Sequence, residues 1–458
     1  MSGRRPASRV PPPASRIGVG LLGYGNIGSE VFRYLQTARG DARVVRVARR
    51  HATGSPPAVR RLLARNAEEV IADPGAQLIV ELTGDGMKGA RYILDAIARG
   101  KHVVTANKEA LATRWPQIME RARRKGVSVG FEATVGGGMP VVRTMQRHVA
   151  ADEVEAFAGI LNGTCNFILT RMREFILRNM DDPDIQKRSL PLQDALAEAQ
   201  RLGYAEPDPT KDLNGFDTKF KVAILANLAF ATRVDPGAID CEGILQPSQQ
   251  IMPSDLFFLH HPRYLGGKYE LKLAGVAQRL AGRPVLRVHP ALLDTTGDLA
   301  DLAAVSGSYN GLVVRGKRLG TQFIKGLGAG PKPTAISVAS DIREIAAAMR
   351  AGSALPVPAA GPPARLGDLR AVRTRGFIRS FSPDVRGIYA KKLEVLAKHN
   401  VSVQSVVNVR EFVYGRDRVM PDYVEIDYAP DGAVRDVLAA FRRLRGVRDP
   451  MYFRVLEV

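Results

Sequence analysis

The chain has 458 residues, of which 45% are hydrophobic and 24% charged, a composition typical of globular proteins. This length suits about three domains. Two cysteines, Cys165 and Cys241, are too few for a disulfide framework or a four-cysteine zinc site. The longest strongly apolar stretch, near Val222–Ala231, has about half of the ~20 residues that a membrane-spanning helix needs. The amino terminus lacks the apolar core of a secretory signal, so we expect a cytoplasmic protein.

The chain is strongly basic, with 66 Lys and Arg against 46 Asp and Glu and a net charge of +20. Such a charge is found in nucleic-acid-binding proteins, but it also describes a well-solvated basic surface. Aromatic residues make up only 6% and do not alternate with basic residues, as a stacking platform for single strands requires. We therefore expect neither nucleic acid nor a membrane as a partner.

Residues 1–15 are rich in Pro, Arg and Ser and predict a disordered tail. Strand and helix patterns then alternate over residues 16–136. The predicted strands are Arg16–Leu22, Ala42–Ala48, Gln77–Thr83, Lys101–Ala106 and Val127–Glu132, and the predicted helices are Gly28–Gln36, Ala90–Ala98 and Trp115–Lys125. This alternation predicts a parallel sheet with βαβ crossovers, which is a Rossmann-type domain.

Residues 137–350 mix helical and strand-like segments and predict an α+β domain, whose last helix, Ala335–Ala348, can pack back on the first domain. The Ala-, Pro- and Gly-rich stretch 351–367 predicts a linker. Residues 368–458 follow the order strand, helix, two strands, helix, strand, which is the ferredoxin-like βαββαβ order. The predicted fold class is therefore α/β, with a Rossmann-type sheet first and a ferredoxin-like domain last.

The segment Gly23–Gly28 (GYGNIG) has the form G-x-G-x-x-G between a predicted strand and a predicted helix, the context in which this motif binds a dinucleotide. Gly23 permits the tight turn, Gly25 lets the backbone approach a pyrophosphate, and Gly28 lets the helix pack closely on the strand. The free amides and positive dipole at the helix N-terminus attract phosphate groups. We predict a dinucleotide site at this turn.

The residues after the second strand bear on the choice of cofactor. An NAD-specific site has an Asp or Glu there, whereas this chain has Ala48, Arg49 and Arg50. Residues 41–65 contain seven arginines and one acid, Asp41. Because arginine accommodates a 2′-phosphate, we predict NADP(H) in preference to NAD(H), with Arg49 and Arg50 as its readers. The alternative is that these arginines only decorate a solvated loop.

Two further segments concentrate polar residues. Thr105–Lys108 (TANK) follows the fourth strand, at the sheet edge where ligands bind in open α/β folds. Gly203–Lys221 is acidic and then enters a helix on which Asp217 and Lys221 are four residues apart, so they share a face. Beyond Lys221 the helix is apolar nearly all round, which predicts that it is buried. Spacing alone does not separate a functional pair from an ordinary helical ion pair.

These motifs resemble those of the homoserine dehydrogenase family over nearly the whole chain after residue 16. The matching segments are GYGNIG, TANK, FEATVGGGMP (131–140), GILNGTCNFIL (159–169), Gly203–Lys221, RVHPALL (287–293) and GLGAGPKPTAISVASD (326–341). The resemblance implies NAD(P)-dependent, reversible reduction of L-aspartate 4-semialdehyde to L-homoserine in threonine, methionine and isoleucine biosynthesis. It also implies a catalytic and oligomerisation domain over 137–350, a homodimer or homotetramer, and an ACT-like, amino-acid-sensing domain over 368–458.

The resemblance also assigns roles to residues. Lys221 matches the proton donor, and Lys108 matches the lysine that polarises the carbonyl and contacts the nicotinamide. The substrate-binding residues, with carboxylates for the ammonium group, are Glu206, Asp217, Asp212 and Gly203. The cofactor-binding residues are Gly23, Tyr24, Gly25, Asn26, Ile27, Gly28, Arg49, Arg50, Thr83, Thr105, Lys108, Gly203 and Gly328. A site for a hard monovalent cation such as Na⁺ is expected at Glu132, Val135, Gly137 and Met139.

The sequence departs from the family pattern in two places. Cys165 stands in NGTCN where the family usually has Thr, and we expect a small buried side chain there rather than a nucleophile. The family's Asp-x-Pro-Gly turn in the ACT-like domain is Asp384–Gly387 (DVRG) here, and Gly387 can still supply special turn geometry. The main alternative function is a catalytically inactive, NADP-binding regulatory protein that senses an amino acid. That alternative predicts the loss of Lys108 or Lys221, and both are present.

Overall fold

The computed structural model describes residues 16–37, 40–51, 54–188, 190–246, 249–383, 385–412 and 419–458. The predicted tail at 1–15 and the turn residue Asp384 lie outside the described residues. The chain divides into two compact units. The first consists of residues 1–110, 114–133 and 334–359, and the second of residues 111–113, 134–333 and 360–458. The domain boundaries given above remain predictions.

The first unit is built on a five-stranded parallel sheet with the order β2–β1–β3–β4–β5. Its strands are β1 (Ile17–Leu22), β2 (Ala42–Ala48), β3 (Leu78–Glu81), β4 (His102–Thr105) and β5 (Val129–Gly130). Its helices include α1 (Asn26–Thr37), α2 (Pro57–Arg60), α3 (Ala67–Ala72), α4 (Gly86–Ala98) and α6 (Trp115–Lys125), and α5 (Lys108–Thr113) starts in it. The predicted Rossmann-type parallel sheet is confirmed.

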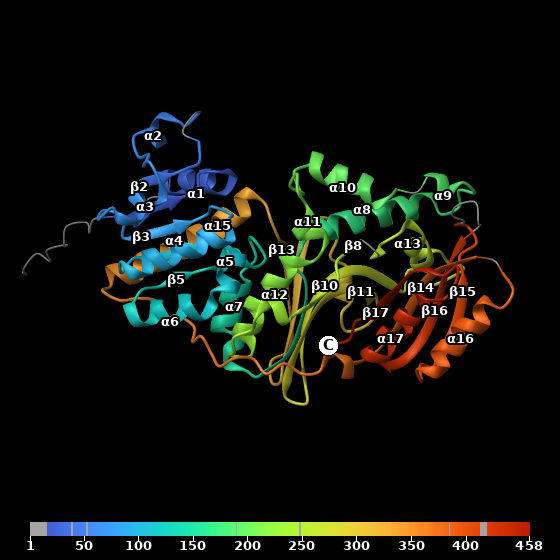
Figure 1. Ribbon diagram of the computed structural model, residues 1–458. Helices are drawn as coiled ribbons and strands as arrows, with labels where there is room; N and C mark the ends of the chain where they lie inside the picture. Colours follow the sequence, from blue (N-terminus) through green and yellow to red (C-terminus); the bar gives the residue numbers. More distant parts are fainter. Residues whose placement is uncertain are drawn as a thin grey trace, which may run out of the picture. The chain divides into compact units, whose positions relative to one another are not determined.

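The helix α15 (Pro331–Arg350) returns to this first unit from far along the chain. Its residues Val338, Ile342 and Ile345 are buried in one core cluster with Val19 and Leu21 of β1. The orange ribbon of α15 accordingly lies among the blue elements of the unit (Figure 1). The core of the first unit therefore includes a helix that follows the central part of the chain.

The second unit contains a ten-stranded sheet with the order β13–β12–β6–β10–β11–β17–β14–β16–β15, and β7 pairs with β11 beside this path. The strands of its central part are β6 (Val154–Ile160), β7 (Asp240–Cys241), β10 (Tyr269–Leu280), β11 (Arg283–Asp294), β12 (Tyr309–Gly316) and β13 (Gly320–Leu327). The helices that concern the site are α8 (Gly163–Asn179), α10 (Leu192–Arg201), α11 (Thr210–Leu213), α12 (Phe216–Ala229) and α13 (Pro253–His260).

The last part of the chain has the predicted βαββαβ order. Its elements are β14 (Arg373–Pro383), α16 (Ile388–Lys398), β15 (Val403–Asn408), β16 (Val419–Pro430), α17 (Asp431–Phe441) and β17 (Arg448–Val455). Its four strands lie in the order β17–β14–β16–β15, with antiparallel neighbours, and this is the ferredoxin-like arrangement. Gly387, which precedes α16, has a left-handed φ of 81°, as expected of the turn glycine.

This ferredoxin-like part is joined directly to the central strands. Strand β17 pairs in parallel with β11 through Ala291–Arg454 and Leu292–Val455, so one sheet continues from the yellow strands into the red ones (Figure 1).

Within the described residues, no helix is both long and apolar enough to cross a membrane. Helix α12 is buried over Val222–Asn227, which confirms the prediction of a buried helix beyond Lys221.

Candidate active site

The turn at Gly23–Gly28 in the first unit requires glycine for three different reasons. Gly23 has a φ of +100°, and a Cβ there would lie 2.5 Å from the carbonyl oxygen of Leu82. A Cβ on Gly28 would lie 2.2 Å from the carbonyl oxygen of Gly23, so the helix packs closely on the turn. Gly25, in contrast, has nothing within 4 Å of its Cβ position, which leaves room for a ligand to approach the backbone. Because the first turn of α1 contains no acidic residue, the turn fits the pyrophosphate of a dinucleotide.

Arg49 lies beside this turn. Its guanidinium carbon is 5.5 Å from the ring centroid of Tyr24, and its Nη1 donates a hydrogen bond of 2.8 Å to Oγ of Ser55. Arg50, the next residue, is exposed. Both arginines thus follow the end of β2, with Arg49 held against the phosphate-binding turn and Arg50 open to solvent.

Glu81 at the end of β3 organises the carboxyl edge of the sheet. Its buried carboxylate accepts hydrogen bonds from the Thr83 amide at 2.9 Å, the Thr83 hydroxyl at 2.6 Å and the Thr105 hydroxyl at 2.8 Å. A buried carboxylate needs such donors to offset the loss of hydration. Sequence analysis predicted Thr83 and Thr105 but not Glu81, although an acidic residue inside the apolar strand QLIVELT was a signal for it.

Lys108 is the first residue of α5 and is half-buried. The preceding residue, Asn107, caps the helix by accepting a hydrogen bond of 3.0 Å from the Ala110 amide. The Asn107 side chain also donates to the carbonyl oxygen of Asp85 at 2.9 Å. Lys108 therefore starts a capped helix directly after the carboxyl end of β4.

In the second unit, Lys221 and Asp217 form a buried ion pair on α12. The Lys221 Nζ lies 2.7 Å from Oδ2 of Asp217 and donates a second hydrogen bond of 2.7 Å to the carbonyl oxygen of Leu161. The two side chains are only 10% and 6% exposed. A protonated lysine has three donors, and within the described residues these two contacts use two of them. The remaining N–H is available to a bound molecule.

Asn162 gathers the acidic residues around this pair. Its Nδ2 donates to Oδ1 of Asp212 at 2.8 Å and to Oδ2 of Asp217 at 2.9 Å. Its Oδ1 accepts a hydrogen bond of 2.8 Å from the Cys165 amide and so caps α8. Sequence analysis placed Asn162 in a matching motif but gave it no role; an Asn at a strand-to-helix junction is a signal for a cap, not for these carboxylate contacts.

Cys165 is fully buried next to this cluster. Its Sγ lies 3.3 Å from the carbonyl oxygen of Asp212, to which it donates. Burial, together with the charges of Asp212 and Asp217, raises the pKa of the thiol well above its ordinary value. A thiol that stays protonated is a poor nucleophile, so the geometry agrees with a small buried side chain at this position.

Glu206 and Gly203 are placed differently from the other predicted substrate residues. Both are exposed, and in the described part of the chain no hydrogen bond or ion pair links the Glu206 carboxylate to Asp212, Asp217 or Lys221. Gly203 follows α10 with a φ of +77°, and its amide donates to the carbonyl oxygen of Gln200 at 3.1 Å. The second unit thus brings together Asp212, Asp217 and Lys221, while the binding roles of Glu206 and Gly203 remain predictions.

Comparisons with known proteins agree with this arrangement. The family model described as "Homoserine dehydrogenase" matches residues 140–342, and the one described as "Homoserine dehydrogenase, NAD binding domain" matches residues 23–132. The homoserine dehydrogenase of Pseudomonas aeruginosa is 33% identical over 452 residues, covering 94% of this chain and 97% of that protein. The chain belongs to the homoserine dehydrogenase family.

Further homoserine dehydrogenases are similar over their full length. That of Bacillus subtilis is 31% identical over 94% of this chain and 96% of its own. A crystal structure of a homoserine dehydrogenase from Thiobacillus denitrificans matches with a TM-score of 0.82 and 31% identity, covering 97% of this chain and 99% of that one. The chain is therefore an oxidoreductase with an NAD(P)-binding domain that acts on a CH–OH group, and the comparisons give no support to the inactive regulatory alternative.

The residues predicted for the cation site belong to both units. Glu132 belongs to the first unit, where its amide donates to Oδ2 of Asp341 at 2.9 Å. Val135, Gly137 and Met139 belong to the second. Gly137 contacts another predicted position, since a Cβ on it would lie 2.6 Å from the carbonyl carbon of Gly328. Among the described residues no group of three or more His, Cys, Asp or Glu side chains could hold a metal, and the cation site stays a prediction.

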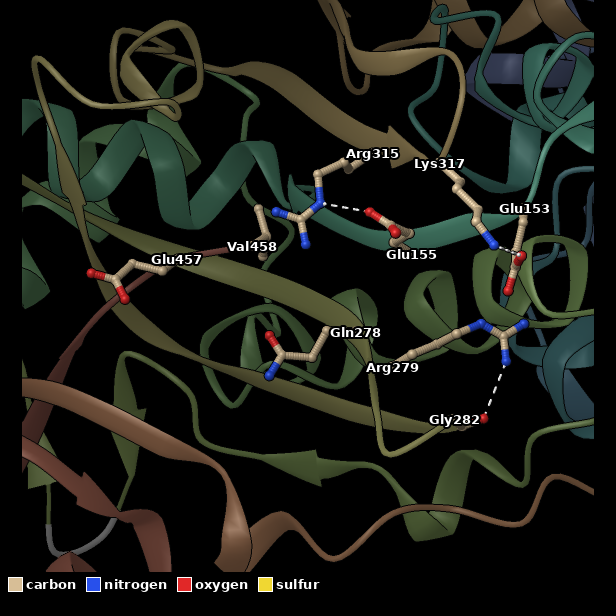
Figure 2. A pocket seen from close by; sticks show the side chains of 9 residues that line it. All are labelled: Glu153, Glu155, Gln278, Arg279, Gly282, Arg315, Lys317, Glu457 and Val458. Atoms are coloured by element: carbon tan, nitrogen blue, oxygen red, sulfur yellow. Dashed lines mark hydrogen bonds and ion pairs between the residues drawn. The ribbon is translucent and has the colours of Figure 1, made fainter.

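A pocket of about 510 Å³ in the second unit contains none of the residues predicted for a homoserine dehydrogenase site. Figure 2 shows two oppositely charged pairs among its lining side chains, while Arg279 donates to the carbonyl oxygen of Gly282. Arg315 lies 3.3 Å from Glu155, and Lys317 lies 3.2 Å from Glu153. These four charges therefore pair with one another.

Proposed function

We propose that the chain catalyses the reversible, NADP(H)-dependent reduction of L-aspartate 4-semialdehyde to L-homoserine. The observation that carries this proposal is the buried Lys221, which has one N–H to spare beside two carboxylates that Asn162 holds together. Reduction of an aldehyde needs a proton donor for the developing alkoxide. The Lys221 ammonium group carries three N–H donors, so it can supply this proton while Asp217 and the carbonyl oxygen of Leu161 hold it in position.

The chain's own residues then have the following roles. Lys221 holds the proton at Nζ and delivers it to the aldehyde oxygen in the direction of reduction. Asp217 and Glu206 bind the ammonium group of the substrate, and Asp212 adds negative charge next to them. Lys108 polarises the carbonyl group. NADP(H) would be held at the Gly23–Gly28 turn and would supply the hydride.

The preference for NADP(H) is supported by the basic end of β2. Arg49 lies against Tyr24 of the phosphate-binding turn, and no Asp or Glu occupies positions 49–51, where an acid would hold an unmodified ribose.

A monovalent cation near Glu132 belongs to the same proposal. Its test is the dependence of turnover on Na⁺ or K⁺ in buffers that are otherwise free of alkali metals.

The ferredoxin-like arrangement of residues 373–455 supports an ACT-like role for the C-terminal part, with an amino acid as effector. We propose a cytoplasmic homodimer or homotetramer that serves threonine, methionine and isoleucine biosynthesis. The oligomeric state is measured by light scattering, and the effector by adding each of these amino acids to the assay.

The direct test follows the absorbance of NADPH and NADH with aspartate semialdehyde, and of NADP⁺ and NAD⁺ with homoserine. We expect oxidation of NADPH with the semialdehyde and reduction of NADP⁺ with homoserine, with lower kcat/KM for the NAD pair. No turnover with either substrate and either cofactor would overturn the proposed function.

A further inference from the structure

The segment Asp240–Ile244, called the 240–244 segment below, contacts the ferredoxin-like part on one side and the turn between α11, which carries Asp212, and α12, which carries Asp217, on the other. Its first two residues form β7, which pairs with β11, and the Glu242 amide donates to the carbonyl oxygen of Val288 at 2.7 Å. Both sides of the segment make specific contacts. No residue in it was singled out by sequence analysis for the reaction.

On one side, the 240–244 segment touches the turn between α11 and α12. The Ile244 amide donates to the carbonyl oxygen of Leu213 at 2.9 Å, and Sγ of Cys241 donates to the carbonyl oxygen of Asn214 at 3.3 Å. A Cβ on Gly243 would lie only 2.1 Å from the carbonyl oxygen of Leu213. This turn directly follows Asp212 and precedes Asp217, so its backbone position sets where both carboxylates lie.

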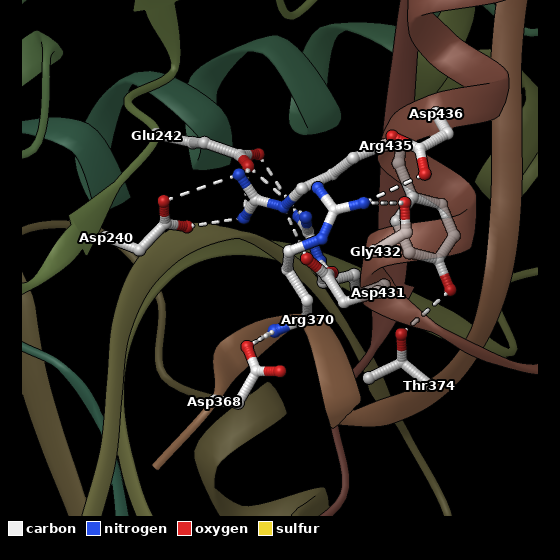
Figure 3. Close-up of polar contacts among 11 residues, drawn as sticks. Asp240, Glu242, Asp368, Arg370, Thr374, Asp431, Gly432, Arg435 and Asp436 are labelled. Atoms are coloured by element: carbon white, nitrogen blue, oxygen red, sulfur yellow. Dashed lines mark hydrogen bonds and ion pairs between the residues drawn. The ribbon is translucent and has the colours of Figure 1, made fainter. Parts of the chain in front are cut away.

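On the other side, acidic residues of the segment bind arginines of the ferredoxin-like part (Figure 3). Glu242 forms a two-pronged ion pair with Arg454 of β17, with Nη–Oε distances of 3.1 and 3.2 Å. Asp240 pairs with Arg435 of α17 at 2.7 Å. Asp431 completes the network by binding Arg454 Nε at 2.7 Å.

The centre of this network is buried. The side chains of Arg454 and Asp431 are 2% and 0% exposed, so each charge depends on its partners for stability in the fold. Two parallel hydrogen bonds between a guanidinium and a carboxylate also define the orientation of both groups. Arg454 of β17 therefore orients the Glu242 carboxylate, while the backbone of Glu242 is held on β11.

We propose that Glu242 is a positioning residue through which the ferredoxin-like part sets the geometry of the substrate carboxylates. Arg454 and Arg435 hold Glu242 and Asp240, and the 240–244 segment presses on Leu213–Gly215. The position of this turn then determines where Asp212 and Asp217 lie. Because Asp217 pairs with Lys221, it also determines where the Lys221 Nζ lies. This inference rests on the proposed roles of Asp212, Asp217 and Lys221, and a ligand bound to the ferredoxin-like part would reach them by the same route.

The test compares Glu242→Gln, which removes the charge, with Asp436→Asn as a matched control. Asp436 forms an ion pair of 2.8 Å with Arg370 in the same part of the molecule, and that pair does not involve the 240–244 segment (Figure 3). We expect Glu242→Gln to lower kcat/KM for homoserine by about 10- to 100-fold, the loss typical of a catalytic group displaced by about 1 Å. The Kd for NADPH should stay within about twofold, and Glu242→Asp should recover part of the loss.

A second variant approaches the same contact from the other side and substitutes none of the ion-paired residues. Gly243→Ala places a methyl group against Leu213, while Gly237→Ala is the control, because its Cβ would lie no closer than 3.3 Å to any atom. Gly243 is not among the glycines with a left-handed φ, so alanine strains the contact and not the backbone. We expect the same loss of kcat/KM in Gly243→Ala and none in Gly237→Ala.

A readout without turnover separates this inference from the proposed function. Cys241 lies in the segment against Asn214, so a displaced segment should expose its thiol, and a thiol reagent should label Cys241 faster in Glu242→Gln than in wild type. Faster labelling together with reduced kcat/KM supports the inference. Folded Glu242→Gln and Gly243→Ala proteins with wild-type kcat/KM overturn it. If the wild type turns over no homoserine, the proposed function fails, and unchanged labelling in both variants then overturns the positioning contact as well.

Discussion

Asn162 donates a hydrogen bond of 2.9 Å to the carboxylate of Asp217, a residue 55 positions away in the sequence. The same amide group binds Asp212, and the opposite oxygen caps α8. The start of one buried helix thus fixes the start of another, on which Lys221 lies one turn further along. Asp212 and Asp217, to which we assign roles at the substrate site, are consequently held in position by the protein itself.

The two carboxylates assigned to the ammonium group should respond differently to neutralisation. Glu206 is exposed, so Glu206→Gln should mainly raise the KM for homoserine if its contact persists from the bound state to the transition state. Asp217 is also the partner of Lys221, so Asp217→Asn should raise KM and lower kcat as well. Steady-state kinetics with homoserine measure both effects. An unchanged KM in both variants would remove these residues from the substrate site.

The choice of cofactor depends on the arginines after β2. Replacing Arg49 and Arg50 together by Ala should weaken NADPH binding by roughly 1.5–3 kcal/mol for each charged hydrogen bond lost. NADH lacks the 2′-phosphate and should bind nearly as before. Fluorescence titration of both reduced cofactors measures the two Kd values. Equal losses for NADPH and NADH would show that the pair does not read the phosphate.

Both thiols should be unreactive in the native protein. Burial raises the pKa of Cys241 to about 12 and that of Cys165 well above its ordinary value, so very little thiolate exists near neutral pH. A chromogenic thiol reagent should therefore react slowly with the native protein and titrate two thiols in denaturant. Rapid labelling of Cys165 with parallel loss of activity would instead mark it as a reactive residue.

The buried Lys272 makes stability depend on pH in an alkaline window. Its Nζ donates to the carbonyl oxygen of Val305 at 2.7 Å, and burial lowers its pKa from 10.5 to about 8. Between these two values the unfolded chain binds a proton that the folded protein lacks, so stability rises with pH, by up to about 1.4 kcal/mol per pH unit. The loss of stability caused by burying the charged Lys272 side chain is fully present below about pH 8 and disappears above about pH 10.5.

Lys272→Met removes this titration. The free energy of unfolding of the wild type, minus that of Lys272→Met, should therefore increase from about pH 8 to about pH 10. Other groups titrate equally in both proteins and cancel in the difference. Denaturant unfolding at several pH values provides the measurement, and a difference that does not change with pH would contradict the lowered pKa.

Local patterns were sufficient to predict many elements from the sequence. The helix Trp115–Lys125 has the predicted bounds, because its amphipathic pattern is regular and Gly126 ends it with a left-handed φ of 65°. The helix α13 was not predicted, since all eight of its residues are buried and periodicity does not identify such a segment.

The site could be predicted only in part for a related reason. Asp217 and Lys221 share a helix, so their spacing indicated the ion pair that the structure contains. The contacts of Asn162 with Asp212 and of Glu242 with Arg454 span 50 and 212 residues. Pairs so distant are set by the packing of helices and by the joining of β11 to β17, which local spacing does not encode.

The most direct test of the mechanism is the turnover of Lys221→Ala. A surface ion pair would be worth about 0–1 kcal/mol of stability and nothing in rate, whereas a general acid contributes about 10²–10⁴-fold. We expect a folded protein that binds NADPH normally and whose kcat is reduced by about 10²–10⁴-fold. Lys219→Ala is the control, because Lys219 is half-exposed and lies over the Phe216 ring at 4.3 Å, and it should retain wild-type kcat. Full turnover in Lys221→Ala would contradict the assignment of Lys221 as proton donor and would leave Lys108 as the leading alternative.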